Sequence, residues 1–222
     1  MRYDFAVFYS NLGINDRVIF LDETGFNLYV RPTKGRARIG QPVRRNTVPR
    51  GRNITATFTI SADVGLVCHR ISHNTTTGAT FQTFVNELCQ QIENIYPPNE
   101  NVYIIYDGAR PHLHANPPAE FQGRIFCRIQ PSYSPFLNPT ELAHSAFKAA
   151  IKQKIGTRAI QDRLADEAAR LHAGVTITEW RLRILTTIAE NSLNTITLQK
   201  CQNWFARILR YIPRCLNRQE IV

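Results

Sequence analysis

No apolar run in the sequence approaches the ~20 residues that a helix needs to cross a bilayer. The first residues, MRYDFAVFYSNLG, contain Asp4 and offer no uninterrupted apolar stretch before a small-residue cleavage site, as a signal or transit peptide would. These two absences exclude a membrane-spanning helix and argue against a signal peptide or a transit peptide at the start of the given sequence.

Cysteine is scarce and irregularly spaced. The chain has an odd number of cysteines and no CxxC pair; they are Cys68, Cys89, Cys127, Cys201 and Cys215. This pattern disfavours a disulfide framework or a zinc knuckle, because both require cysteines at regular, paired spacings. We therefore expect reduced, buried thiols in an intracellular protein.

Acidic residues are the minority among the charged residues. Lysine and arginine number 27 against 17 for aspartate and glutamate, so the formal net charge is +10. Such an excess of positive charge favours a polyanionic partner, most often nucleic acid. A soluble basic protein without such a partner would have the same composition, so charge alone does not decide between the two.

The positive charge is concentrated between Glu23 and Asp63, where the chain has no acidic residue. Glycines and prolines in this segment are typical of a loop. Its cationic residues are Arg31, Lys34, Arg36, Arg38, Arg44, Arg45, Arg50 and Arg52. With eight cations and no anion, contact with DNA phosphates is favoured over a merely solvated loop.

The first half of the chain has the hydrophobic patterns of strands. Residues 54–60 alternate threonine with apolar side chains, and residues 65–71 are expected to pair with them as a hairpin. The continuous apolar runs VIFL at 18–21 and VYIIY at 102–106 are typical of buried strands, and 125–129 is a further strand.

The other segments have helical periodicity. Apolar residues recur at helical spacing from Phe81 to Ile95, and two prolines then end that helix. From Asn138 onward the chain is helical, with further helices expected around 164–171, 180–188 and 204–212. This order of elements predicts an α/β fold, with a mixed sheet flanked by helices and a helical C-terminal extension.

Two aspartates directly follow the buried runs. Asp22 comes after VIFL, and Asp107 comes after VYIIY. An aspartate after a strand is most often a turn former. Two of them at one sheet edge, however, would place like charges side by side, and Mg²⁺ or Mn²⁺ between them would stabilise both. Glu23 is the alternative to Asp22, but neighbouring strand residues point to opposite faces, so we prefer Asp22.

A third carboxylate, Glu141, lies at the start of a predicted helix. Asn138 is a good N-cap and Pro139 suits the first helical position, so Glu141 could reach back to the helix start in a capping box. Taken alone, this capping role is more common for such a glutamate than metal binding.

Three ordered segments together resemble the catalytic core of mariner-type transposases, members of the DDE transposase and integrase superfamily. The segments are DETGFN at 22–27, YDGARPH at 106–112 and PSYSPFLNPTE at 131–141. Asp22, Asp107 and Glu141 match the family's three acidic residues, and the 33 residues between the last two are close to the family's tight spacing. The resemblance runs from about residue 17 to 154 and depends on the ordered combination of motifs.

The resemblance implies a ribonuclease H-like fold and metal-assisted cleavage and strand transfer of DNA. Asp22 and Asp107 would be the main ligands of two Mg²⁺ or Mn²⁺ ions, and Glu141 would bind one of them. DNA is the expected partner and nuclear residence is expected in a eukaryote; a homodimer is compatible, whereas a membrane or a small-molecule cofactor is not expected. The side chains expected to support the ligands are His112, Asn138 and His144.

The chain departs from the family pattern beside these residues, although no departure removes a ligand. Gly108 stands where the family usually has asparagine, which removes a side chain that could orient the site. Thr140 replaces an aliphatic residue, and Phe136 replaces a common aspartate. His144 replaces a frequent tryptophan and shares a helical face with Glu141; a role in titration near the metals is one interpretation, and a surface position is preferred. His112 is expected either as a packed structural residue or in contact with the site or DNA.

Mariner-type transposases carry helix-turn-helix domains ahead of the catalytic domain, whereas only 21 residues precede Asp22 here. We expect residues 1–16 to be a linker remnant, 17–155 the catalytic domain with a basic hairpin insertion at about 30–52, and 156–222 the helical extension. The expected function is a DNA transposase catalytic domain without end recognition. The alternative is a domesticated or relict DNA-binding protein without catalysis; a decayed chain is disfavoured, because no apolar face is interrupted by a charge run.

Overall fold

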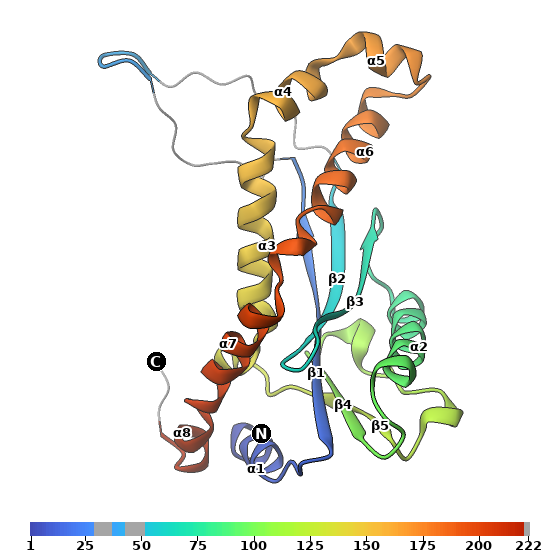
Figure 1. Ribbon diagram of the computed structural model, residues 1–222, viewed down its shortest axis with the longest axis vertical. Coiled ribbons are helices and arrows are strands. Elements are labelled where there is room, and N and C mark those ends of the chain that lie inside the picture. Colours follow the sequence, from blue (N-terminus) through green and yellow to red (C-terminus); the bar gives the residue numbers. More distant parts are fainter. Residues whose placement is uncertain (29–36, 43–51, 220–222) are drawn as a thin grey trace.

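The computed structural model describes residues 1–28, 37–42 and 52–219 (Figure 1). Most of the basic segment therefore lies outside the described residues, namely Arg31, Lys34, Arg36, Arg44, Arg45 and Arg50. Arg38 and Arg52 are described, and both are exposed.

A five-stranded mixed sheet forms the centre of the fold, in the order β3-β2-β1-β4-β5. β1, β4 and β5 run parallel to one another, whereas β2 is antiparallel to both of its neighbours. The strands are β1 (Asp16–Phe26), β2 (Ile54–Ser61), β3 (Gly65–Ser72), β4 (Asn101–Tyr106) and β5 (Ile125–Ile129).

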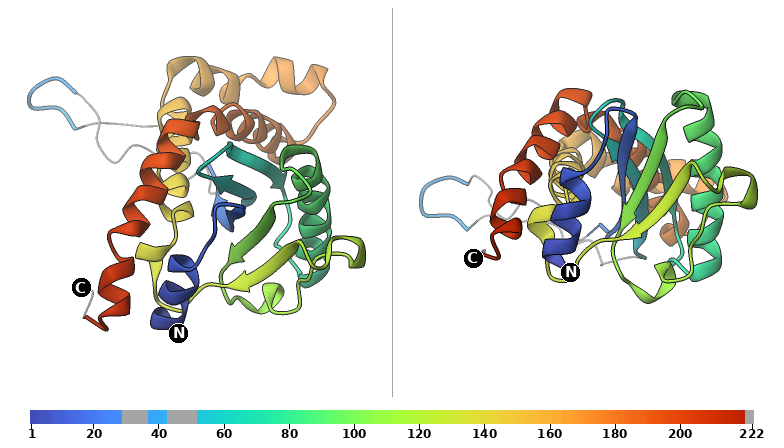
Figure 2. Two further views of the ribbon diagram at one scale, coloured as in Figure 1. Left: turned by 60° about the horizontal axis from the view of Figure 1, so that its bottom comes forward. Right: turned by 90° about the horizontal axis from the view of Figure 1, so that it is seen from below.

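Helices cover both faces of this sheet (Figure 2). α2 packs on one face, and α3, α6 and α7 pack on the other. The helices are α1 (Arg2–Ser10), α2 (Gly78–Ile95), α3 (Thr140–Ile155), α4 (Arg158–Ala165), α5 (Glu167–His172), α6 (Ile177–Glu190), α7 (Leu198–Leu209) and α8 (Ile212–Leu216). Within the described residues, no helix combines the length and the hydropathy needed to span a membrane.

Alternate residues of β1 supply the two cores. Val18 and Phe20 join the core on the α3 side, whereas Ile19 and Leu21 join the core on the α2 side. Successive residues of a strand point to opposite faces of the sheet, and this alternation continues beyond Leu21. Residue 22 therefore faces α3, and residue 23 faces the opposite side.

The predicted hairpin, central strand, last strand and first long helix are all present, as β2 and β3, β4, β5 and α2. β1 is longer than expected, so Asp22 lies within the strand rather than after it. The reason is its pairing: β1 leaves β4 after the Phe20–Ile105 pair but remains paired to β2 as far as Phe26 and Ile54.

One hydrophobic core crosses both of the expected domain boundaries, at residues 16 and 155. Residues 2–10, which were expected in a linker remnant, form α1, and its Phe5 and Ala6 are buried in the core. At the other end of the chain, Phe205 of α7 meets Phe20 of β1 edge-on, with ring centroids 5.5 Å apart. The C-terminal helices therefore complete the core of the sheet.

Two of the predicted C-terminal helices are each divided into a pair. α4 ends before Asp166, whose carboxylate caps α5 by accepting a hydrogen bond from the backbone N–H of Ala169 at 2.9 Å. Leu171, expected on an apolar face, is 62% exposed. Likewise α7 ends at Leu209, and Pro213 fits the first turn of α8 because that position needs no N–H donor.

Candidate active site

An open cleft of about 700 Å³ collects the three predicted carboxylates. Asp22 lies on β1, Asp107 directly follows β4, and Glu141 lies in the first turn of α3. The fold thus brings together three side chains that are spread over 119 positions of the sequence, from 22 to 141.

Strand register places the two aspartates at the same level. The last parallel pair between β1 and β4 is Phe20 with Ile105. Asp22 comes two positions after Phe20 and Asp107 two positions after Ile105, so both aspartates lie just beyond the end of this ladder. This arrangement puts the two carboxylates at one edge of the sheet, where α/β folds commonly bind their ligands.

Asp22 is held by three hydrogen bonds. Its Oδ2 accepts from Asn138 Nδ2 and from Thr140 Oγ1, both at 2.9 Å, and its Oδ1 accepts from the backbone N–H of Glu23 at 2.7 Å. The hydroxyl of Thr140 also lies 2.5 Å from Asn138 Oδ1. The sequence analysis predicted a supporting role for Asn138 but not for Thr140, which it noted only as a departure from the family pattern. The hydroxyl group of Thr140, next to Glu141 in the sequence, is the feature that could have indicated this role.

The electrostatic environment of Asp22 favours a nearby cation. Burial, with a smaller contribution from the negative charge of Asp107, raises the pKa of Asp22 to about 6, against the opposing effect of the hydrogen bonds from Glu23, Thr140 and Asn138. A positive charge between the two carboxylates would relieve both effects.

Asp107 is oriented by a buried histidine. Its Oδ1 lies 2.5 Å from His112 Nδ1 and accepts a 3.2 Å hydrogen bond from the backbone N–H of Ala109. The His112 ring stacks on Phe81, with centroids 3.9 Å apart. Hydrogen bonding to His112 holds the pKa of Asp107 below its ordinary value. His112 is thus both a packed residue and a contact of the site.

Glu23 also reaches the cleft, contrary to the expectation that only one of the two neighbours would do so. Its side chain leaves the opposite face of β1, where Oε2 lies 3.5 Å from His112 Nε2. Burial opposes a charged His112, but the carboxylates of Asp107 and Glu23 outweigh it and raise the pKa of His112 to about 9. Glu23 therefore acts on the site through His112.

The capping interpretation of Glu141 is not what the structure shows. α3 begins at Thr140 with Pro139 at its N-cap, and no side chain caps the helix. Asn138 Oδ1 instead accepts from the backbone N–H of Thr140, at 3.1 Å, while its amide faces Asp22. Glu141 is exposed on the cleft and is free to bind a ligand there.

The chemistry of these donors suits a divalent cation such as Mg²⁺ or Mn²⁺, which prefers oxygen ligands. Among the described residues, no three acidic, histidine or cysteine side chains are close enough together to hold one ion as they stand. The cleft therefore has suitable ligands from three separate elements, and a bound ion would draw them closer together.

His144 is buried, which corrects the expectation of a surface histidine. It lines the inner wall of the cleft, and its ring meets Phe58 edge-on at 4.9 Å between centroids. Burial, together with the nearby charge of Lys148, lowers the pKa of His144 to about 3. The ring is therefore neutral at physiological pH and belongs to the packing beneath the site.

This burial predicts a pH dependence of stability. Below pH 6.5 the unfolded chain protonates His144, whereas the folded chain does not until about pH 3. The free energy of unfolding should therefore fall as the pH drops below 6.5, with a slope approaching about 1.4 kcal/mol per pH unit from this residue. Urea unfolding between pH 7 and 5 should show a shallower dependence for His144→Gln than for the parent chain. An unchanged dependence would contradict the burial of this ring, and His69→Gln, at an exposed position, is the matched control.

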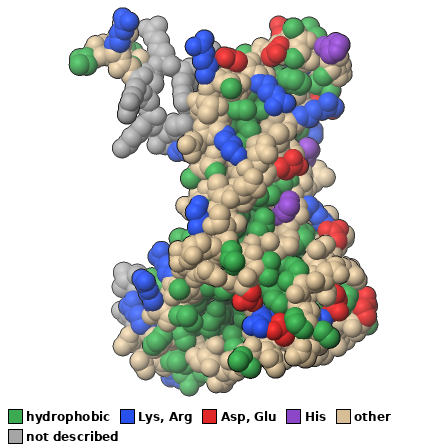
Figure 3. Space-filling view, in the orientation of Figure 1, with side chains coloured by type: hydrophobic (Ala, Val, Ile, Leu, Met, Phe, Trp, Pro, Cys, Tyr) green, Lys and Arg blue, Asp and Glu red, His purple; other side chains and the backbone are tan. Residues whose placement is uncertain are grey.

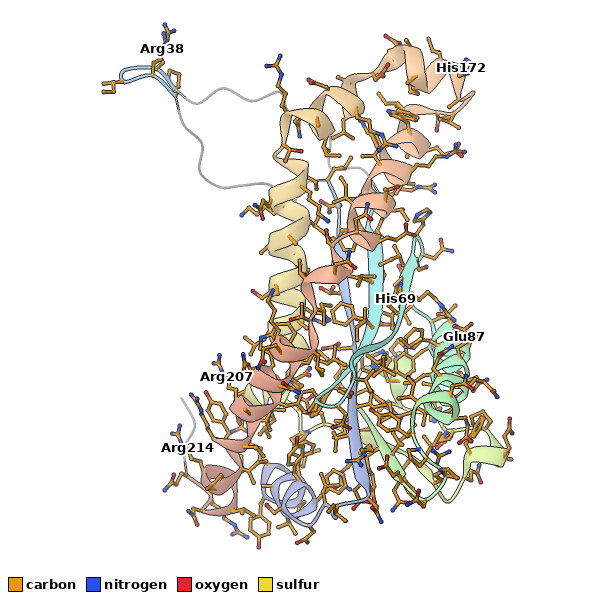
Figure 4. The ribbon with its side chains drawn as sticks, viewed as in Figure 1. Arg38, His69, Glu87, His172, Arg207 and Arg214 are labelled. Carbon is orange, nitrogen blue, oxygen red and sulfur yellow. The ribbon has the colours of Figure 1, made fainter. Side chains whose placement is uncertain are left out.

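Basic side chains lie both at the cleft and on surfaces away from it. Lys148 lines the cleft two turns along α3 from Glu141. Figure 4 places Arg38 well away from the sheet, on the short stretch 37–42, and Arg207 and Arg214 beside α7 and α8. In Figure 3, Lys and Arg side chains gather along the side of α7 and α8, while several acidic side chains lie on the side of α2.

Similar architectures occur among solved transposase structures. The mariner Mos1 paired end complex with Mg matches with a TM-score of 0.61 and 14% identity, over 98% of this chain and 60% of that chain. The Mos1 transposase paired-end complex with left transposon end gives 0.60 and 13%, with the same coverage. The catalytic domain of Mos1 mariner transposase gives 0.57 and 11%, over 100% of this chain and 92% of that chain.

At these identities the likeness shows the fold, and it confirms the predicted class of a ribonuclease H-like mixed sheet flanked by helices. The chain spans about 60% of the length of the paired-end complex chains that it matches. A search of curated proteins gave no match. The family model described as DDE superfamily endonuclease matches residues 17–164, about two thirds of the chain. The protein therefore belongs to the DDE superfamily endonuclease family.

Proposed function

We propose that this chain is a transposase catalytic domain that cleaves DNA phosphodiester bonds and transfers the resulting strand ends, in a reaction that requires Mg²⁺ or Mn²⁺. The observation that carries this proposal is the convergence of Asp22, Asp107 and Glu141 on one cleft. Solved structures of Mos1 include paired end complexes with Mg and with Mn, which supports the same metals here.

Each carboxylate has a distinct role in this proposal. Asp22 and Asp107 would hold two ions, and their orientations are fixed by Asn138 and Thr140 on one side and by His112 on the other. Glu141, exposed on the cleft, would bind one ion and accept a proton from the attacking water or 3′-hydroxyl. When bound, the ions supply activation of that nucleophile and charge stabilisation at the leaving oxygen.

DNA is the proposed partner. Lys148 is placed to contact a phosphate at the cleft, and exposed Arg38 and Arg52 belong to the basic segment that we expect to contact the backbone further away. The remaining cations of that segment lie outside the described residues. The proposal extends to a homodimer and, for a eukaryotic source, to residence in the nucleus.

Supercoiled plasmid gives a direct test, because a single nick converts it to the relaxed form. The parent chain should nick plasmid with Mg²⁺ or Mn²⁺ and not with EDTA. Glu141→Gln should be inactive but folded, since the side chain is exposed and is not used to cap α3. Asp162→Asn, on α4 outside the cleft and 70% exposed, is the matched control and should retain activity.

Nicking that survives in Glu141→Gln would come from another site or a contaminant and would contradict the proposal. A folded parent chain that binds DNA but never nicks it, even when the end-binding domain is supplied, would favour a DNA-binding protein without catalysis.

A further inference from the structure

Tyr133 has a backbone conformation that disfavours its side chain. Its φ is 53°, in the left-handed region, where glycine or asparagine is normally found. The ring is 93% exposed, so it adds almost nothing to the packing of the fold. A turn selected only for stability would carry glycine here, which suggests that the ring serves a binding partner.

The loop that carries Tyr133 is fixed by hydrogen bonds. Arg2 of α1 donates from Nη2 to the carbonyl oxygen of Tyr133 at 2.7 Å and from Nε to Ser134 Oγ at 2.9 Å. Gln130 Nε2 donates to the carbonyl oxygen of Ser134 at 3.0 Å, and the Arg2 guanidinium lies over the Phe136 ring at 5.2 Å. The ring therefore projects from a braced backbone, which reduces the entropy lost on binding.

The position of the ring is defined by the cleft. Tyr133 lines the same cleft as the three carboxylates, on the loop between β5 and α3. Lys148 lines it as well and supplies a positive charge for a phosphate. If a phosphate of a DNA strand lay at the carboxylates, the neighbouring nucleotides of that strand would lie near Tyr133 and Lys148.

We propose that Tyr133 stacks on an unpaired nucleobase of the DNA strand bound in the cleft, next to the phosphate that reacts. This inference rests on the proposed function and adds a binding site for a base to it. Aromatic rings bind bases of every sequence in this way, because each base has a flat face. Tyr133 is thus a sequence-tolerant contact that orients the strand.

Two substitutions separate the ring from the backbone. Tyr133→Gly removes the ring and relieves the left-handed conformation, so the thermal midpoint should stay level or rise. Tyr133→Phe keeps the ring and should bind like the parent chain. Binding is measured with a single-stranded oligonucleotide carrying 2-aminopurine, in Ca²⁺ to prevent cleavage, and the fluorescence of the probe reports stacking.

Tyr133→Gly should bind this oligonucleotide about tenfold more weakly and lose the fluorescence change of the probe, as expected for the loss of one base–aromatic stack. Equal binding by the parent chain and Tyr133→Gly would overturn the inference. The exposed ring would then be better explained by contact with a protein partner. If the parent chain also nicks plasmid, that result overturns the base contact alone. Ring-dependent binding without nicking would support the base contact and contradict the proposed catalysis.

Discussion

Replacing Asp107 with asparagine should lower the metal-dependent nicking rate by at least about a thousandfold while leaving the fold intact. Bound ions contribute several kcal/mol of transition-state stabilisation, which corresponds to about three orders of magnitude in rate. Asp107→Asn keeps an oxygen that can accept from His112 Nδ1 and the Ala109 N–H, so the contacts that orient this side chain are retained. The lost negative charge is then the main change.

Initial rates of plasmid nicking in Mg²⁺ and Mn²⁺, with thermal unfolding of each sample, measure this effect. Asp107 is half exposed, so Asp107→Asn should remain folded, with a thermal midpoint lowered by the loss of the charge pair with His112. A folded Asp107→Asn variant that nicks at a rate within tenfold of the parent would remove Asp107 from the catalytic site.

The largest effect on stability is expected at Phe58. Its side chain is fully buried on β2, directly opposite Asp22 in the strand pairing, and it contacts both His144 and Phe147. Phe58→Ala would leave a cavity between β2 and α3, and large-to-small changes of this kind cost about 3–5 kcal/mol. This packing joins α3, which carries Glu141, to β2, the neighbour of the strand that carries Asp22.

Urea unfolding should show this loss as a lower midpoint with an unchanged slope. Phe126→Ala removes the same side chain from β5, where the ring is 36% exposed, and its cost should be clearly smaller. Equal losses for the two variants would mean that the core beneath the site is less tightly packed than the contacts of Phe58 indicate.

The sheet could be predicted because its signals are local. Threonine alternation in β2, the run VYIIY in β4 and helical spacing in α2 each identify an element without any knowledge of its neighbours. The sequence did not predict that the helix around 164–171 is divided into two at Asp166. An N-cap residue can end one helix and begin the next without changing the spacing of the apolar residues. β1 was too short in the prediction, since its continuation is set by pairing to β2.

The acidic residues of the candidate site could be predicted from the sequence, whereas most of the side chains that orient them could not. Asp22, Asp107 and Glu141 follow from their motifs, but the hydrogen bond from Thr140 to Asp22 joins residues 118 positions apart. The link from Glu23 to His112 and the burial of His144 likewise depend on how β1, α2 and α3 pack. Such contacts are properties of the tertiary arrangement and leave no periodic signal.

The central claim is that three carboxylates from separate elements form one metal site. Its most direct test is thermal unfolding of the parent chain, Asp107→Asn and Asp162→Asn with increasing Mn²⁺ and no DNA. An ion that binds only the folded state stabilises it by about 2.7 kcal/mol at a hundred times its dissociation constant. We predict that Mn²⁺ raises the midpoints of the parent chain and of Asp162→Asn and has little effect on Asp107→Asn. Equal responses of all three proteins, or no response of the parent chain, would contradict a metal site in this cleft.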